Sequence, residues 1–239
     1  MSAEEWGKLD EIVVFAARQF LVGRRFIELV GPLGAGTEVV AVGSGEERKV
    51  LDLVFIEEDF GLSWRDIEAN RKAGLPPDLG AAAKASMACA RKEDEMIFGA
   101  LTAAAGKQVP IGDWSEPRSA FASIVEATEK LVADSFYGPF VVVLSPALYA
   151  KTQRVVEGVG RLESKLIKDV AEGGVFRSPV LGEGQGLVLS LGVFNLDLVV
   201  GQDLITAYMG NDKLDHCFRV LESLVLRIKR PGAICALAQ

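Results

Sequence analysis

Apolar residues recur at helical spacing in several long segments of the chain. In the first segment, Trp6, Leu9 and Val13 follow a period of three to four residues. Gly23 stands just beyond its last turn, where helices commonly end. Asp78 is suited to cap a second, alanine-rich segment. These patterns predict helices over residues 3–22, 79–104, 118–133 and 162–171, and a further helix that begins at Ser145-Pro146.

Shorter apolar runs between glycine-rich and proline-rich turns are typical of strands. They lie at residues 26–30, 37–42, 50–55, 140–144, 186–191, 196–200, 204–209, 218–228 and 233–237. Because the connection at 43–49 is polar, residues 37–55 are predicted to form a hairpin that projects from the body. Residues 59–71 are expected to form a short helix or a loop. Helices and strands do not alternate regularly, which predicts an α+β fold.

Composition narrows the class of protein. The chain has 239 residues, 49% of them hydrophobic and 25% charged, which suffices for one sizeable core. Its net charge of −7 argues against a general nucleic-acid binder. The N-terminus lacks a signal-peptide pattern, and no apolar run reaches the length of a membrane span. We therefore expect a soluble, cytoplasmic protein that binds neither nucleic acid nor membrane.

Two motifs invite a chemical function, and both have a simpler interpretation. The cluster Gly31–Gly36 follows a strand, but its spacing departs from the dinucleotide fingerprint and a strand follows it, so a tight turn is favoured. Glu93, Asp94 and Glu95 form an acidic run on the long helix. Because no Glu-x-x-His accompanies them, we predict a solvated or interface ion-pair face and not a metal site.

The only histidine, His216, is followed by Cys217. Neighbours on a strand point to opposite faces, so the two cannot act together as base and nucleophile. The three cysteines are far apart and form no CxxC pair. We expect no catalytic residue, no metal site and no cofactor. A small-molecule enzyme that uses His216 is retained as the alternative from a different class.

A series of segments spans nearly the whole chain: WGKLDEIVVFAARQFLVGRRF at 6–26, VGPLG at 30–34, DFGLSWRDIE at 59–68, RKEDEMIFG at 91–99, VPIGDW at 109–114, IVEATEKL at 124–131, GPFVVVLSPAL at 138–148, GQDL at 201–204 and FRVLESLVLRIKRPGAIC at 218–235. In their order and coverage, these segments resemble the encapsulin shell proteins, which build protein nanocompartments in bacteria and archaea.

The resemblance implies the fold of tailed-bacteriophage major capsid proteins. It implies that residues 1–36 hold a lumen-facing N-terminal helix and the start of a peripheral domain, and that 37–58 form a shortened extended loop. The peripheral domain with its long spine helix would cover 59–132, the axial domain 133–210, and 211–239 would return to the peripheral domain. At the loop tip, the charges of Glu46, Glu47, Arg48 and Lys49 would either set register against a neighbour or be solvated.

The resemblance also implies function. Such chains assemble into closed icosahedral shells and enclose cargo enzymes, often ferritin-like or peroxidase, linked to iron storage or oxidative stress. Cargo docks through a short C-terminal peptide, and the positions that correspond here are Leu21, Arg24, Glu28 and, more weakly, Ile205. Glu183 and Gln185, in a glycine-rich loop, are expected to line a pore. A major capsid protein of a phage or prophage is the alternative within the same fold. Shell size and cargo identity remain open.

Overall fold

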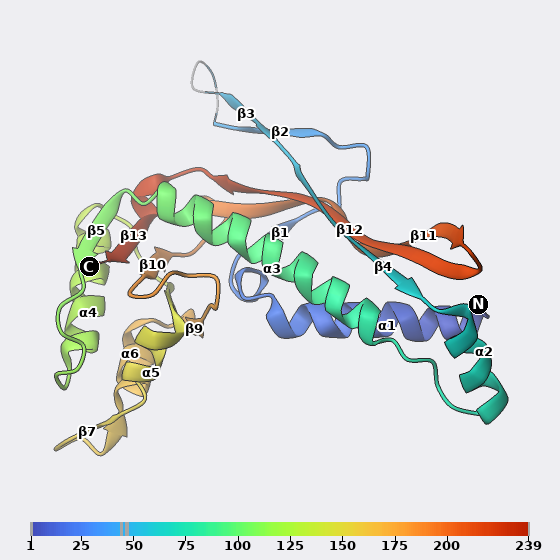
Figure 1. Cartoon of the computed structure of the whole chain (residues 1–239). Helices are drawn as coiled ribbons and strands as arrows, with labels where there is room; N and C mark the ends of the chain where they lie inside the picture. The colour runs from blue at the N-terminus through green and yellow to red at the C-terminus, as the bar shows by residue number, and fades with distance from the viewer. Residues whose placement is uncertain (1, 44, 46–47, 239) are drawn as a thin grey trace.

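The computed structural model of the chain describes residues 2–43, 45 and 48–238. Two long helices dominate it (Figure 1): α1 (Ala3–Phe20) and α3 (Gly80–Ala103), as the apolar periodicity predicted. Ser2 caps α1 in a reciprocal capping box with Glu5. Asp78 accepts a hydrogen bond from the Gly80 amide at 2.9 Å, although Leu79 and not Asp78 occupies the N-cap position of α3.

The remaining helices are shorter. They are α2 (Trp64–Ala73), α4 (Ser119–Ala133), α5 (Pro146–Lys151), α6 (Glu163–Val170), and the 3-10 turns η1 (Gly23–Arg25) and η3 (Pro231–Ala233). Helices α4 and α6 confirm the predicted ranges to within one residue at each end, and α5 begins at the predicted Ser145-Pro146. Among the described helices, none combines the length and the apolar character that crossing a bilayer requires.

A four-stranded sheet lies beside α1 and α3, with strand order β1-β11-β12-β4. Its members are β1 (Leu29–Val30), β11 (Leu196–Asp212), β12 (Asp215–Ile228) and β4 (Val54–Leu62). The prediction of two separate strands at 196–200 and 204–209 is wrong, because one strand spans both. The polar residues Gln202 and Asp203 interrupt the apolar pattern, but the ladder absorbs them as register shifts and resumes.

A second, five-stranded sheet has the order β5-β13-β10-β6-β9. Its strands are β5 (Lys107–Pro110), β13 (Ile234–Ala238), β10 (Gly186–Ser190), β6 (Phe140–Leu144) and β9 (Gly174–Arg177). Three of them were predicted. The edge strands β5 and β9 were not, because four residues flanked by glycine leave little apolar pattern to detect.

Two small hairpins project from the body (Figure 1): β2 (Val39–Val42) with β3 (Lys49–Asp52), and β7 (Val155–Val156) with β8 (Arg161–Leu162). The first confirms the projecting hairpin predicted for 37–55. Of the expected charge block at its tip, Glu46 and Glu47 lie outside the described residues. Residues 59–62 continue β4 instead of forming a loop or helix, because they pair with β12 from Asp59↔Arg219 to Leu62↔His216.

The two larger of three buried clusters lie one on each face of the five-stranded sheet. Leu187 and Leu189 of β10 join a cluster with Ile97 and Phe98 of α3, which extends beneath the four-stranded sheet. Between those two leucines, Val188 points the other way, into a cluster formed with helix α4. The central strands are therefore buried on both faces, which explains their uninterrupted apolar sequence.

Candidate functional site

A surface groove of about 330 Å³ runs between α1, the turn that follows it, and β11. Leu21, Arg24 and Leu204 line it. Its other lining residues are Val14, Ala17, Arg18, Arg25, Leu29 and Asp203. The groove therefore combines an apolar surface with three arginines and one carboxylate.

Helix α1 supplies one wall of the groove through a single face. Val14, Ala17, Arg18 and Leu21 stand at positions i, i+3, i+4 and i+7, which lie above one another on a helix. Leu21 is 8% exposed, whereas Val14 is 38% exposed. Sequence reasoning identified Leu21 but missed Val14 and Arg18. The helical spacing from Leu21 was the signal that could have found them.

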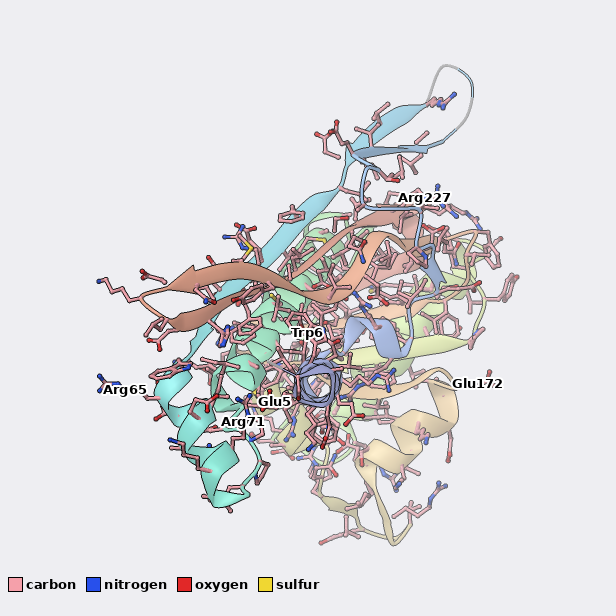
Figure 2. All side chains as sticks on the ribbon, turned by 90° about the vertical axis from the view of Figure 1, so that its right-hand side faces the viewer. Glu5, Trp6, Arg65, Arg71, Glu172 and Arg227 are labelled. Carbon is pink, nitrogen blue, oxygen red and sulfur yellow. The ribbon has the colours of Figure 1, made fainter. Side chains whose placement is uncertain are left out.

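Both ends of α1 are anchored to other elements. At its start, the Glu5 carboxylate accepts a hydrogen bond from Arg71 of α2, with Oε1 and Nη2 3.0 Å apart. Figure 2 looks along α1 and shows Glu5 and Trp6 at the near end, with Arg71 beside Glu5. At its end, Asp94 accepts the amide hydrogens of Val22 and Gly23 at 2.9 and 3.0 Å. The wall of the groove is thus fixed from two sides.

Gly23 has a steric role in the turn that follows α1. A Cβ atom built on it would lie 2.8 Å from the Cδ1 atom of Ile97 on the spine helix α3. A side chain at this position would force Ile97 to shift, so glycine lets the turn lie close to α3, where Asp94 reaches its backbone amides. The turn held by Asp94 in this way presents Arg24 and Arg25 to the groove.

Arg24 is held by three carboxylates from three different elements. Its Nε donates to both oxygens of Glu93 on α3 at 2.8 and 3.0 Å. Its Nη1 donates to Asp203 on β11 at 2.6 Å, and its Nη2 to Glu222 on β12 at 2.7 Å. The arginine that was expected to contact a peptide is therefore also the central member of an internal network, and its side chain is 13% exposed.

The acidic run on α3 corrects a prediction made from the sequence. Glu93 is 0% and Asp94 2% exposed, so neither forms the solvated ion-pair face that was expected. Only Glu95, paired with Arg91 at 2.9 Å, behaves in that way. The helix turns Glu93 and Asp94 inward, where they accept hydrogen bonds from the chain around residues 22–24. The charged residues next to Glu93 and Asp94 in the sequence could not reveal that their partners lie about seventy positions away.

The network shifts the pKa of several members. Burial by itself lowers the pKa of the Arg24 guanidinium, but its hydrogen bonds to Glu93 and Asp203 raise it above the ordinary range. Burial raises the pKa of Asp94 to about 6, against the two backbone amides that favour its charged form. For Asp203 burial is outweighed by Arg24, which lowers the pKa of that carboxyl below its usual value.

The other two residues assigned to peptide binding lie outside this groove. Glu28 is exposed and lines a separate cavity of about 390 Å³, together with Phe26, Pro139 and Phe194. Ile205 follows Leu204 on β11 and is 42% exposed, but it does not line the groove. The structure brings Leu21 and Arg24 together on the groove, whereas Glu28 and Ile205 are only the sequence neighbours of lining residues, Leu29 and Leu204. Asp203 and Leu204, which line the groove, lie in the GQDL segment at 201–204 that carries part of the family resemblance.

The residues assigned to a pore lie in the connection between β9 and β10. Gln185 is committed to the turn itself, because its Oε1 accepts the amide hydrogen of Gly182 at 3.0 Å. Gly184 adopts a φ of 74°, which favours glycine at that point of the turn. Glu183 is exposed. The loop therefore presents one free acidic side chain.

His216 stands far from this groove, near the end of the β11–β12 hairpin. Its Nδ1 lies 3.0 Å from the Tyr208 hydroxyl, and its ring packs near Phe218. It pairs in the ladder with Asn211 and Leu62. Within the described residues no carboxylate hydrogen-bonds to it and no cysteine or serine side chain does so, and its one side-chain partner is the Tyr208 hydroxyl.

Comparison with known proteins gives the family. A family model described as "Encapsulating protein for peroxidase" matches residues 1–225. The chain is 43% identical to the type 1 encapsulin shell protein EncA of Myxococcus xanthus, over 98% of this chain and 92% of the relative. This chain belongs to the encapsulin shell protein family. A diheme-cytochrome–encapsulin shell fusion protein of Kuenenia stuttgartiensis is 38% identical over 99% of this chain and 73% of its own length.

Solved structures confirm the encapsulin fold. The virus-like particle from Pyrococcus furiosus superposes with a TM-score of 0.86 at 20% identity, covering 98% of this chain and all of that one. A structure of Mycobacterium phage Che8 superposes with a TM-score of 0.60 at 15% identity, covering 83% and 81%. The α+β fold of tailed-phage major capsid proteins, expected from the resemblance, is therefore confirmed. As a member of this family the chain is an encapsulin shell protein, and the two relatives above are named as a shell protein and a shell fusion protein.

Proposed function

We propose that this encapsulin holds its cargo by a short C-terminal peptide seated in the groove between α1 and β11. The observation that carries the proposal is the composition of the groove, in which an apolar face of α1 lies against the polar pair Arg24 and Asp203. Apolar side chains of an extended peptide would occupy the space beside Leu21 and Leu204, while the polar pair orients its backbone. A shell repeats this groove in every subunit, so modest affinity per site suffices for multivalent cargo.

The test is a pair of matched substitutions. Val14→Glu places a charge on the groove wall, whereas Val193→Glu places the same charge at a site of nearly equal exposure outside the groove, 38% against 39%. A ferritin-like or peroxidase protein encoded beside the shell gene is co-produced with each variant, with and without its C-terminal segment. We expect Val14→Glu to form empty shells and Val193→Glu to load normally. Full loading of Val14→Glu shells would overturn the proposal.

The enclosed enzyme carries out the chemistry in this proposal, and the shell chain has no activity of its own. A peroxidase cargo, linked to oxidative stress, is supported by the peroxidase in the family description. A ferritin-like cargo, linked to iron storage, is the other candidate. The compartment is proposed to lie in the cytoplasm, with no nucleic acid in it. A nucleic-acid absorbance spectrum from purified shells would contradict this and favour the phage alternative.

The pore and the domain limits are also proposals. Glu183 is proposed to line a pore, with Gln185 supporting the turn. Glu183→Lys is expected to change ion influx, and an unchanged influx would overturn that role. For the domains, we keep the proposed axial range 133–210 and the peripheral ranges 59–132 and 211–239. The five-stranded sheet departs from these limits, because it joins β5 and β13 to β10, β6 and β9. The sheet of β4, β11 and β12 supports a peripheral unit beside α1 and α3.

A further inference from the structure

Two buried carboxylates share one guanidinium directly beneath the groove. Glu93 is 0% and Glu222 1% exposed, and each binds Arg24. The Nε–H and Nη2–H of an arginine point along the same edge of the guanidinium, and this edge ordinarily receives the two oxygens of one carboxylate. Here it receives two different carboxylates, at 2.8 and 2.7 Å. The two acids are therefore forced close together.

The hydrogen bonds distinguish the two acids. The single Nε–H of Arg24 is shared between both oxygens of Glu93, so neither of them is without a donor. Glu222 uses Oε2 alone, and its Oε1 is buried with no hydrogen-bond partner among the described residues. A buried carboxylate oxygen without a donor is strongly unfavourable, whereas a carboxylic acid can donate from that same atom.

The surrounding charges do not compensate for two buried anions. Within the described residues, Arg24 is the one cation that hydrogen-bonds to Glu93 or Glu222. Asp94 on α3 and Asp203 on β11 add negative charge, and Asp203 is itself paired with Arg24. The remaining titratable or charged groups nearby are Arg18 of α1, Arg25 of η1, Cys89 and Lys92 of α3, and Glu57 and Glu58 of β4. One guanidinium balances one buried carboxylate and leaves the second without a counter-ion.

We propose that Glu222 is a neutral carboxylic acid in the folded shell, that its Oε1 donates a hydrogen bond to Glu93, and that the pair positions Arg24 beneath the groove. Proton sharing converts two repelling anions into a hydrogen-bonded pair with a single negative charge, which Arg24 matches. The positive Arg24, the negative Glu93 and the neutral Glu222 then form a balanced buried unit. Asp203 at the groove surface takes the remaining Nη1–H of Arg24.

The electrostatics of the site agree with this geometry. Burial, followed by the negative charge of Glu93, raises the pKa of Glu222 from its ordinary 4.5 to about 9. The folded chain therefore keeps this proton across a range in which the unfolded chain has lost it. Stability that depends on Glu222 falls as pH rises from about 4.5 to about 9, and it is largest on the acid side.

Deprotonation has a defined structural consequence. A charged Glu222 repels Glu93 along the edge of Arg24 that both acids share, so one of them has to withdraw. Arg24 then loses a support from β12 or from α3, and the groove loses the side chain that orients Asp203. Alkaline pH is thus expected to loosen the floor of the groove before it unfolds the rest of the chain. This consequence for peptide binding rests on the proposed function, whereas the protonation state does not.

The deciding experiment compares empty shells of the wild type, Glu222→Gln and Glu93→Gln in thermal unfolding between pH 6 and pH 10. Glutamine at 222 keeps the size of the side chain and an N–H donor toward Glu93. We expect Glu222→Gln to match or exceed the wild-type midpoint at pH 7, and to lose at least half of the wild-type decrease between pH 7 and pH 10. Glu93→Gln, which removes the anion that Arg24 needs, is expected to lower the midpoint at every pH.

The opposite result is equally clear. If Glu222 is an ionised partner of Arg24, Glu222→Gln will lower the midpoint at pH 7 as Glu93→Gln does, and the alkaline slope will not change. Infrared spectra of empty shells provide the second readout. A carbonyl band of a protonated carboxylic acid is expected at pH 7 in the wild type and absent in Glu222→Gln, and a band absent from both would overturn the proposal. Because both readouts use empty shells, they succeed or fail independently of cargo binding.

Discussion

The Arg24 cluster and the cluster around Asp197 are both buried, but they hold their charges in opposite proportions. In the first, one guanidinium serves the two buried carboxylates Glu93 and Glu222. In the second, one carboxylate that is 1% exposed serves two cations: Asp197 accepts from Arg227 at 2.8 and 2.7 Å and from Lys229 at 2.6 Å. Both clusters join elements of the same sheet.

The difference shows that the ratio of carboxylates to cations in a buried cluster decides whether a carboxylate there is protonated. Burial alone would raise the pKa of both acids. At Asp197 the hydrogen bonds from Arg227 and Lys229 overcome burial and lower the pKa below 3.8. At Glu222 the neighbouring Glu93 adds to burial, and the pKa rises. The contribution of Asp197 to the free energy of unfolding is therefore present above pH 3.8 and is lost as pH falls through the lowered pKa. The contribution of Glu222 to the same quantity is lost as pH rises.

The largest expected effect comes from Arg24→Ala. It leaves Glu93 and Glu222 buried together without a cation, and breaking such a buried pair costs about 4 kcal/mol. The loss is expected to be larger at pH 8 than at pH 5, because the carboxylates can take up protons at the lower pH. Thermal unfolding of purified shells at both pH values measures it. The control is Arg25→Ala, an exposed neighbour that makes no ion pair among the described residues, with an expected change below about 1 kcal/mol.

Asp197→Ala is the matching disruption of the second cluster. It leaves Arg227 and Lys229 without their carboxylate. Arg227 is then no longer held by Asp197 in the orientation from which it donates to the Ala41 carbonyl of the projecting hairpin at 3.1 Å. Because those cations are 22% and 29% exposed, we expect a smaller loss of about 3 kcal/mol.

The loss in Asp197→Ala should be the same at pH 5 and pH 8, since neither arginine nor lysine titrates in that range. A loss that differed between the two pH values would contradict the contrast between the clusters. Asp169→Ala is the matched control. Its pair with Arg161 is 50% and 58% exposed, and its removal is expected to change stability by less than about 0.5 kcal/mol.

A steric change sharpens the same comparison without altering any charge. Gly23→Ala forces a Cβ against Ile97 and displaces the turn that Asp94 and Arg24 hold, with an expected loss of about 2 kcal/mol. Gly7→Ala on α1 is the control, because nothing lies within 4 Å of its added Cβ and helix propensity favours alanine. Denaturant unfolding of the two variants should give changes of opposite sign.

Much of the fold could be predicted from local pattern alone. The helices α1, α3, α4 and α6 follow from apolar periodicity, and β6 from an uninterrupted apolar run. The errors lie where pairing overrides pattern. Residues 59–62 look mixed in sequence, but they complete β4 because β12 offers a ladder opposite them. Likewise, Gln202 and Asp203 appear to end a strand, and only the register with β12 shows that it continues.

The groove residues could be predicted only in part, and from the family resemblance instead of from local pattern. Leu21 and Arg24 came from the family resemblance, and the structure places both on one groove. The carboxylates that hold Arg24 could not be found in this way, because Glu93 and Glu222 are 69 and 198 residues distant from it. An acidic run beside two basic residues is ordinary for a solvated helix. Only the three-dimensional packing of α3 against η1 turns Glu93 inward.

The smallest expected effect concerns His216, a titratable group that lies in neither cluster. Its Nδ1 has the Tyr208 hydroxyl as its hydrogen-bond partner at 3.0 Å, at a partly exposed position near the end of the β11–β12 hairpin. His216→Ala removes one side-chain hydrogen bond, so we expect a change below about 1 kcal/mol, with shell assembly and cargo loading unchanged. Light scattering for particle mass and a cargo-to-shell ratio measure both. If wild-type shells without cargo turn over a small molecule and intact His216→Ala shells do not, the alternative in which the chain is an enzyme is favoured. A structural role for His216 predicts no catalytic consequence.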